Sequence, residues 1–252
     1  MLKPRIIPTL LLRNGRMVKG KYFNNYIDTG DPVYAARVYN SQYVDELIFI
    51  DIDATHENRD PNFDIINKVS KECFMPFTLG GGINNLQQIR SLLLSGADKV
   101  IINTAAINNK EFVLQAVENF GSQCIIIAID VRKVGTNYIV YTHSGRNECE
   151  LSLTEYLKTV KDYNVGEIFI NSIDRDGMMN GYDIDLITTV INHINIPVIA
   201  CGGAGNFMHL YEAFNETNVS ALGMGSIFHF SDNNPIRARS FLKNQGINLK
   251  VV

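Results

Sequence analysis

Short, continuous apolar runs alternate with helix-like segments along the whole chain, and this alternation constrains the fold more than any other feature. Eight apolar runs occur, near residues 6–12, 46–51, 75–79, 98–103, 124–130, 167–173, 196–201 and 220–225. Unbroken Ile, Val, Leu and Phe runs are typical of parallel strands that are covered on both faces. The helix-like segments lie near 31–43, 62–72, 84–95, 109–119, 152–164, 183–193, 206–215 and 234–244. Eight strand–helix units in 252 residues predict an α/β fold, a single (β/α)8 TIM barrel over residues 1–252.

Local signals support individual elements of this barrel. Asp31 precedes Pro32, and proline is favoured at the first helical position after an N-capping residue. Ser152 and Glu155 have the spacing of a capping box. Residues 133–144 contain a glycine turn between two β-type arms, which predicts a hairpin inserted after the fifth strand.

The two halves of the chain resemble each other where their predicted strands end. Equivalent strand ends carry similar small or polar residues about 120 residues apart. The pairs are Gly82 and Gly203 at an offset of 121, Thr104 and Ser226 at 122, and Asp51 and Asn171 at 120. This repeat predicts a barrel built from two similar half-barrels.

Composition excludes several classes of function. A net charge of −3 and a pI near 6.0 argue against a nucleic-acid-binding or membrane-surface protein. The longest apolar runs are strand-sized and the N-terminal residues lack a signal-peptide pattern, so we expect no membrane span and a cytoplasmic location. The cysteines lack metal-ligand spacing, which indicates reduced packing residues; they are Cys73, Cys124, Cys149 and Cys201. We predict no metal and no cofactor.

Glycines and polar residues follow several predicted strands, where the active site of a barrel is built. Glycines placed there let backbone N–H groups approach an anion. Gly82, Asn103 and Thr104 predict a first anion cradle. The second predicted cradle comprises Gly202, Gly203, Gly225 and Ser226, roofed by Asp176 and Gly177. A single glycine pair is more often a tight turn, but two matched cradles favour a long substrate with an anionic group, most simply phosphate, at each end.

A proton-transferring group is expected between the two cradles. Asp130 ends the fifth predicted strand, where its carboxylate can face the barrel mouth. The equivalent strand of the first half, residues 6–12, contains no carboxylate. Asp51 is a second candidate for acid–base catalysis, although it could equally be a structural hydrogen-bond acceptor for neighbouring loops.

Four charged residues stand at the opposite ends of the strands. Arg5, Glu46, Lys99 and Glu167 lie at the starts of the first, second, fourth and sixth predicted strands. Two cations and two anions can form a balanced ring across the barrel bottom, since buried charges require partners. Ordinary surface charge at strand starts is the alternative.

Short motifs along nearly the whole chain form a specific set. They include Arg5–Pro8, Val18–Gly20, Gly80–Ile83, Gly96–Val100, Ser172–Gly177, Gly202–Gly205 and Ile227–Phe230. Together they resemble the cyclase subunit of imidazole glycerol phosphate synthase (HisF). The resemblance implies a lyase that converts the bisphosphate PRFAR to imidazole glycerol phosphate and AICAR, with its phosphates on the two cradles. It also implies a mobile first loop that carries Lys19.

The same resemblance implies a partner. A glutaminase (HisH-type) subunit would dock on the N-terminal face of the barrel and form a heterodimer. Ammonia would then pass through the barrel beyond a gate formed by Arg5, Glu46, Lys99 and Glu167.

One position departs from the family pattern. The family has two catalytic aspartates, of which the second matches Asp130 and the first falls on Leu11. Leucine cannot transfer a proton, and loss of a general acid–base group costs about 10²–10⁴-fold in rate. Relatives with an uncharged first strand are associated with surface-sugar amidation, and this chain resembles that subgroup.

Three functions follow from these observations. The first is a cyclase subunit, of the histidine pathway or a paralogous route, that uses ammonia from a glutaminase. The second is a non-cyclase ammonia conduit and scaffold for amidation of a nucleotide-linked sugar, serving a separate sugar amidotransferase. The third is a sugar-phosphate isomerase of the sister type (HisA), which Leu11 and the charge ring both disfavour.

Overall fold

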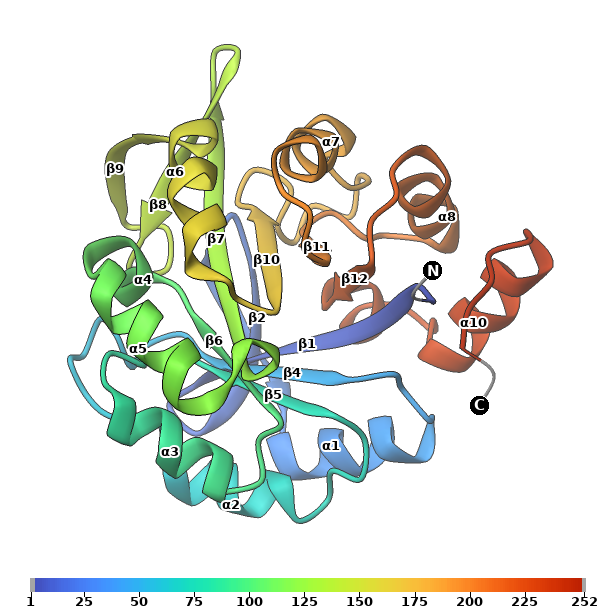
Figure 1. Ribbon diagram of the computed structural model, residues 1–252. Helices are drawn as coiled ribbons and strands as arrows, with labels where there is room; N and C mark the ends of the chain where they lie inside the picture. The colour runs from blue at the N-terminus through green and yellow to red at the C-terminus, as the bar shows by residue number, and fades with distance from the viewer. Residues whose placement is uncertain (1–2, 251–252) are drawn as a thin grey trace.

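Eight parallel strands close into a barrel in the computed structural model, which describes residues 3–250 (Figure 1). Neighbouring strands pair in parallel, and β10 pairs with β7 to complete the ring. The barrel strands are β1 (Arg5–Arg13), β4 (Leu47–Asp51), β5 (Phe77–Gly80), β6 (Lys99–Ile102), β7 (Ile125–Val134), β10 (Glu167–Ser172), β11 (Val198–Cys201) and β12 (Ala221–Met224). The predicted TIM barrel is confirmed, and every predicted strand overlaps an observed one.

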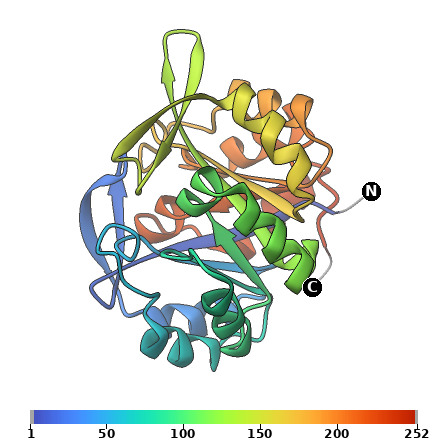
Figure 2. The ribbon, with the colours of Figure 1, turned by 60° about the vertical axis from the view of Figure 1, so that its left-hand side comes forward.

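Helices surround the barrel on its outer side (Figures 1 and 2). The longer ones are α1 (Pro32–Ser41), α2 (Phe63–Ser70), α3 (Leu86–Leu94), α5 (Lys110–Phe120), α6 (Leu153–Val160), α7 (Ile184–His193), α8 (Phe207–Glu216) and α10 (Pro235–Asn244). Two short helices, α4 (Thr104–Asn108) and α9 (Ser226–His229), follow β6 and β12. Two 3₁₀ turns, Ser122–Cys124 and Lys161–Tyr163, complete the set within the described residues. Sequence periodicity predicts all the longer helices, whereas α4 and α9 are too short to produce a period.

Side-chain caps fix where the predicted helices begin. Asp31 accepts a hydrogen bond of 2.8 Å from the Tyr34 amide at the start of α1, with Pro32 at the first helical position. Ser152 and Glu155 form the expected capping box at α6. Both caps satisfy backbone amide groups that have no partner inside the helix, and they therefore define the residue at which each helix begins.

The strands are covered on both faces, which explains their unbroken apolar runs. Between strands and helices lies the larger core, with Phe49, Phe77 and Tyr156 among its largest fully buried side chains. Inside the barrel lies a smaller, separate apolar cluster, which comprises Ile7, Ile48, Ile101, Ile126, Ala128, Phe169, Ile199 and Ala221. The inner cluster fills the middle of the barrel, so polar chemistry is confined to its two ends.

Two β-hairpins extend from the barrel at equivalent positions of the two halves. The first consists of β2 (Arg16–Lys21) and β3 (Asn24–Gly30) after β1. The second consists of the extended end of β7 with β8 (Asn137–Thr142), to which β9 (Asn147–Ser152) adds a further strand. The β7–β8 turn projects from the molecule in both views (Figures 1 and 2) and confirms the predicted hairpin. The expectation that Lys19 lies in a loop is wrong, because Lys19 is buried in β2.

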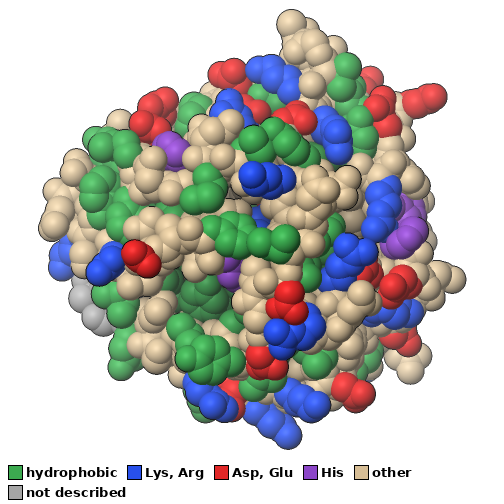
Figure 3. Space-filling model, turned by 180° about the vertical axis from the view of Figure 1, so that it is seen from behind, with side chains coloured by type: hydrophobic (Ala, Val, Ile, Leu, Met, Phe, Trp, Pro, Cys, Tyr) green, Lys and Arg blue, Asp and Glu red, His purple; other side chains and the backbone are tan. Residues whose placement is uncertain are grey.

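The molecular surface carries mixed charge. Acidic and basic side chains are interspersed on the face seen in Figure 3, as expected for a net charge of −3. Among residues 3–250, no helix is both long enough and apolar enough to cross a membrane.

Candidate active site at the barrel mouth

A cavity of about 740 Å³ opens at the C-terminal ends of the barrel strands. It is lined by both hairpins and by the loops that follow β4, β5, β6, β10, β11 and β12. All the predicted catalytic and phosphate-binding residues line it: Lys19, Asp51, Gly82, Asn103, Thr104, Asp130, Asp176, Gly177, Gly202, Gly203, Gly225 and Ser226. Leu11 lines the same cavity, and its own strand contributes no carboxylate to it.

The predicted glycines stand where the backbone leaves no room for a side chain. Gly81 and Gly202 have φ values of 101° and 97°, and a Cβ atom on either would lie within 2.7 Å of the carbonyl oxygen of the last residue of the preceding barrel strand. Gly82 and Gly203 repeat the pattern with φ values of 72° and 107°. Positive φ at both positions of both pairs bends the chain sharply away from its strand, which opens space over the strand ends.

The two cradles have matching backbone geometry beyond the glycines. Asn103 (φ −114°, ψ −91°) precedes α4 in the first cradle, and Gly225 (φ −127°, ψ −73°) precedes α9 in the second. This agreement between positions 122 residues apart supports the half-barrel repeat expected from the sequence.

Several buried polar atoms of residues that line the cavity have no hydrogen-bond partner among residues 3–250. They are Asn103 Oδ1, Asn171 Oδ1, Asp176 Oδ2 and Ser226 Oγ. Buried polar atoms are nearly always hydrogen-bonded, because an unmet donor or acceptor costs free energy. Four such atoms around one cavity indicate a site built for a polar ligand.

Lys19 and Asp176 form a buried ion pair at the second cradle. The Nζ–Oδ1 distance is 2.5 Å, and both side chains are less than a tenth exposed. The Tyr22 amide donates to the Asp176 carbonyl at 2.9 Å, so the β2–β3 hairpin is fastened to the loop after β10. Burial and the nearby Lys19 charge lower the pKa of His229 to about 4, which keeps this neighbouring imidazole neutral.

Asp130 is positioned between the cradles. The Asn103 side-chain amide donates to Asp130 Oδ2 at 2.8 Å. Burial and the negative charge of Asp176 raise the pKa of Asp130 to about 7, although the Asn103 hydrogen bond opposes that rise. A carboxyl group that titrates near neutral pH can both donate and accept a proton there, as general acid–base catalysis requires.

Asp51 is committed to neighbouring groups rather than free in the cavity. Arg59 binds both of its carboxylate oxygens, at 2.7 Å and 2.9 Å. The Asp53 and Ala54 amides also approach Asp51 Oδ1, at 3.3 Å and 3.2 Å. This geometry favours the structural alternative for Asp51, and its catalytic role stays a prediction.

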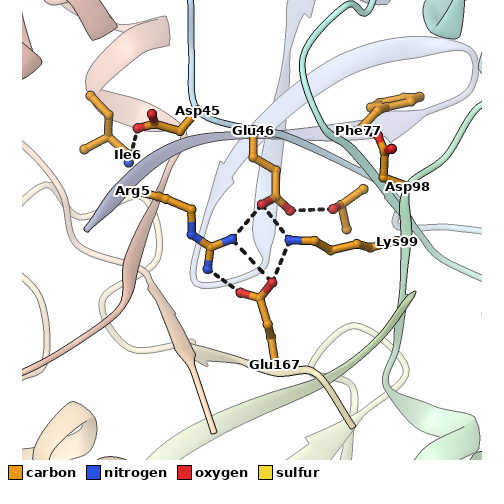
Figure 4. A network of polar contacts seen from close by, with 9 residues as sticks. Arg5, Ile6, Asp45, Glu46, Phe77, Asp98, Lys99 and Glu167 are labelled. Atoms are coloured by element: carbon orange, nitrogen blue, oxygen red, sulfur yellow. Dashed lines mark hydrogen bonds and ion pairs between the residues drawn. The ribbon is translucent and has the colours of Figure 1, made fainter. Parts of the chain in front are cut away.

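A four-charge cluster occupies the opposite end of the barrel (Figure 4). Glu46 accepts from Arg5 and Lys99 at 2.8 Å each, and Glu167 accepts from Lys99 at 2.6 Å and pairs with Arg5. Thr78 donates a further hydrogen bond of 2.5 Å to Glu46. Burial disfavours the ionised form of Glu167, but the bond to Arg5 and the charges of Arg5 and Lys99 outweigh it and lower its pKa. The four predicted gate residues therefore lie together as a closed, charge-balanced cluster.

Sequence reasoning missed other residues that line the cavity. Arg59 and Tyr26 lie in an irregular loop and an exposed hairpin, where no periodic pattern identifies them. His143 follows β8 and also lines the cavity; its only sequence signal is its place at the end of the predicted hairpin. Across residues 3–250, no group of three or more His, Cys, Asp or Glu side chains is arranged to hold a metal ion.

Comparison with known proteins agrees with this arrangement. Residues 5–234 match the family described as histidine biosynthesis protein. Over 251 residues, which cover 100% of each chain, the protein is 43% identical to the imidazole glycerol phosphate synthase subunit HisF of Chlorobium phaeobacteroides and 42% identical to that of Chlorobium phaeovibrioides. The chain therefore belongs to the histidine biosynthesis protein family, among the relatives of the HisF subunit.

Proposed function

We propose that this protein is a HisF-type cyclase subunit that uses ammonia to process a small bisphosphate in the barrel mouth. The four unpartnered polar atoms around one cavity carry this proposal, because they lie at the matched cradles and beside Asp130. Two anion sites on opposite sides of one mouth fit a substrate with a phosphate at each end, such as PRFAR. Full-length similarity to two HisF subunits supports the same substrate class.

The roles of individual residues follow from their positions. The cradles hold the two phosphates and so place the reacting centre between them, which replaces a bimolecular encounter by a fixed geometry. Asp130 exchanges protons with the bound intermediate, supported by the Asn103 amide. Lys19 contributes positive charge at the second cradle, where a phosphate would compete with Asp176 for its ammonium group.

The N-terminal face is assigned to a glutaminase (HisH-type) partner in a heterodimer. The charge cluster of Arg5, Glu46, Lys99 and Glu167 lies on the path from that face into the barrel and acts as the ammonia gate. Ammonia released by the partner would pass the cluster and the inner apolar layer to reach the mouth. We assign the complex to the cytoplasm, which the four free cysteines support.

Leu11 favours a second candidate function. Its alkyl side chain lines the cavity where the family resemblance expects a catalytic carboxylate. A conduit that passes ammonia to a separate sugar amidotransferase needs the gate and the barrel but not a second proton-transferring group. The two candidates therefore differ in whether the mouth performs the chemistry.

Turnover of PRFAR with ammonium ions separates these candidates. We expect slow turnover by the purified protein, since removal of one acid–base group costs about 10²–10⁴-fold. Leu11→Asp should raise the rate at least tenfold, because it places a second carboxylate at the mouth. A tenfold rise corresponds to a decrease of about 1.4 kcal/mol in the activation free energy. Asp130→Asn is the control and should abolish the remaining turnover.

The opposite results are equally informative. Fast turnover by the unaltered chain would show that Asp51 or a water molecule supplies the second proton step. No turnover by either the unaltered chain or Leu11→Asp, with phosphate still bound at both cradles, would contradict the cyclase role and favour the conduit.

A further inference from the structure

Each half-barrel supplies one basic side chain from its hairpin to the barrel mouth. The β2–β3 hairpin brings Lys19 beside the second cradle, where its methylene groups lie 3.3 Å from the position of a Cβ on Gly225. The strands that follow β7 bring His143 beside the first cradle, where the His143 amide donates to Thr104 Oγ1 at 3.1 Å. The two basic groups thus occupy corresponding places at the two cradles.

The backbone around His143 is held in an unusual conformation. His143 and Ser144 have φ values of 52° and 56°, in the left-handed region that side-chain-bearing residues seldom adopt. Ser144 Oγ donates to the Ile52 carbonyl at 2.8 Å and so fixes this turn against the loop after β4. Strained residues that the surrounding structure holds in place gather at functional sites.

Contacts to one ring nitrogen orient the imidazole of His143. Nδ1 lies 3.1 Å from Thr142 Oγ1 and 3.2 Å from the Asn147 side-chain nitrogen. When the Asn147 amide donates to Nδ1, the ring hydrogen lies on Nε2, and this is the tautomer that anion binding through Nε2 requires. Both described ring contacts involve Nδ1, and His143 lines the cavity, so Nε2 is the nitrogen left for a ligand.

The other basic side chains that line the cavity are already paired. Arg59 binds Asp51 through two nitrogens and Glu57 through a third, at 2.6 Å. Lys19 pairs with Asp176 at the second cradle. Among the described residues, His143 is the only histidine that lines the cavity, and it lies at the cradle that lacks an available lysine or arginine.

We propose that His143 is the anion-binding side chain of the first cradle, where it donates Nε2–H to a phosphate group of the ligand. It is the counterpart of Lys19 at the second cradle. This inference rests on the proposed function, because it requires the cradles to bind anions. His143 positions the ligand and takes no part in proton transfer.

Titration with inorganic phosphate tests this role directly. Ring-nitrogen NMR signals of His143 should shift as the Thr104 amide signal reports filling of the first cradle, while those of His193 on α7 should not move. His143→Asn should weaken phosphate at the first cradle about tenfold or more, since a hydrogen bond to a charged group is lost. Asparagine tolerates the left-handed backbone but is too short to replace the ring.

A matched variant at the other cradle identifies which site is affected. Lys19→Met should weaken phosphate at the second cradle, followed through the Ser226 amide, and leave the His143 ring response in place. His193→Gln should leave both affinities unchanged.

Two outcomes would contradict the assignment of His143. Phosphate bound at both cradles with an unmoved His143 ring and unchanged affinity in His143→Asn would overturn the assignment and leave the proposed function intact. Absence of phosphate binding at either cradle would overturn both.

Discussion

Asp130 combines a buried position with a charged neighbour, and this combination has a cost. A carboxylate placed between Asn103 and the field of Asp176 is less favourable when ionised than it is in water. The residue proposed to transfer protons therefore weakens the fold at the pH where its carboxyl group is ionised.

We predict that Asp130→Asn stabilises the protein at alkaline pH. The pKa is raised from 3.8 to about 7, so the folded protein binds this proton more tightly than the unfolded chain. The free energy of unfolding contributed by Asp130 thus falls as pH rises from about 4 to about 7. Asparagine removes this fall, and we expect a gain of about 1–3 kcal/mol at pH 8, less than the full shift because the cavity admits water.

Urea unfolding of both proteins at pH 5 and pH 8 measures this difference. His229, with a pKa lowered to about 4, acts in the opposite direction over an overlapping range. Its contribution is shared by both proteins, so the comparison between them isolates Asp130. An equal pH slope in both would show that Asp130 ionises without penalty.

Sequence reasoning identifies residues at strand ends better than it identifies their partners. Asp130 and the cradle glycines were predicted because the barrel rhythm gives their position directly. The Asp51–Arg59 pair was not, because Arg59 lies in an irregular loop whose path depends on tertiary contacts. Asp51 was therefore considered a candidate for acid–base catalysis beside its structural alternative, and its contacts to Arg59 favour the structural alternative.

At the scale of elements, the β2–β3 hairpin forms part of the candidate active site, because its residues line the cavity. The loop after β10 supports it, because Gly177 lies against Gly20 so closely that a Cβ would be 2.1 Å from the Gly20 carbonyl oxygen. The hairpin escaped prediction because β3 is polar and largely exposed, without the alternation that marks a half-buried strand. Asn14–Gly15, with both φ values positive, is the turn that leads from β1 into β2, and its sequence signal could have indicated that the chain folds back here.

A pair of glycine variants tests this contact. Gly15 and Gly177 have φ values of 73° and 75°, but a Cβ on Gly15 meets nothing within 4 Å. Gly15→Ala should cost only the backbone strain, about 1 kcal/mol. Gly177→Ala adds the steric overlap and should cost about 3 kcal/mol in total.

Hydrogen exchange gives the second readout of these variants. Amides of β2 and β3 should exchange faster in Gly177→Ala than in Gly15→Ala, because only the former separates the hairpin from its support. Equal exchange and equal unfolding free energy would show that the hairpin does not depend on this contact.

At the scale of the whole molecule, the barrel has a closed end and an open end. The four-charge cluster closes the N-terminal end, and the inner apolar cluster separates it from the mouth. Eight units and their order follow from sequence because each is local. The same order places the four charged residues at strand starts and so predicts the cluster, but which cation pairs with which carboxylate depends on residues as distant as Arg5 and Glu167.

Single and complete replacements of the cluster should differ in the size of their effect on stability. Glu46→Gln leaves two cations with one carboxylate and should destabilise the protein by about 3–5 kcal/mol. Replacement of all four members by Leu or Met should be nearly neutral, because no buried charge is left unpaired. Thermal and urea unfolding measure both, and a large loss in the complete replacement would mean that the cluster exists to hold the fold together.

The half-barrel repeat allows one half of the chain to be compared with the other. Each position in one half has an equivalent position about 120 residues away in the same molecule. By that comparison Leu11 is a position at which the two halves differ, because the equivalent strand of the second half carries Asp130 and both residues line the cavity. A second carboxyl group at the mouth therefore requires one side-chain change and no rebuilding of the scaffold, so the same barrel can carry either one acidic group there or two.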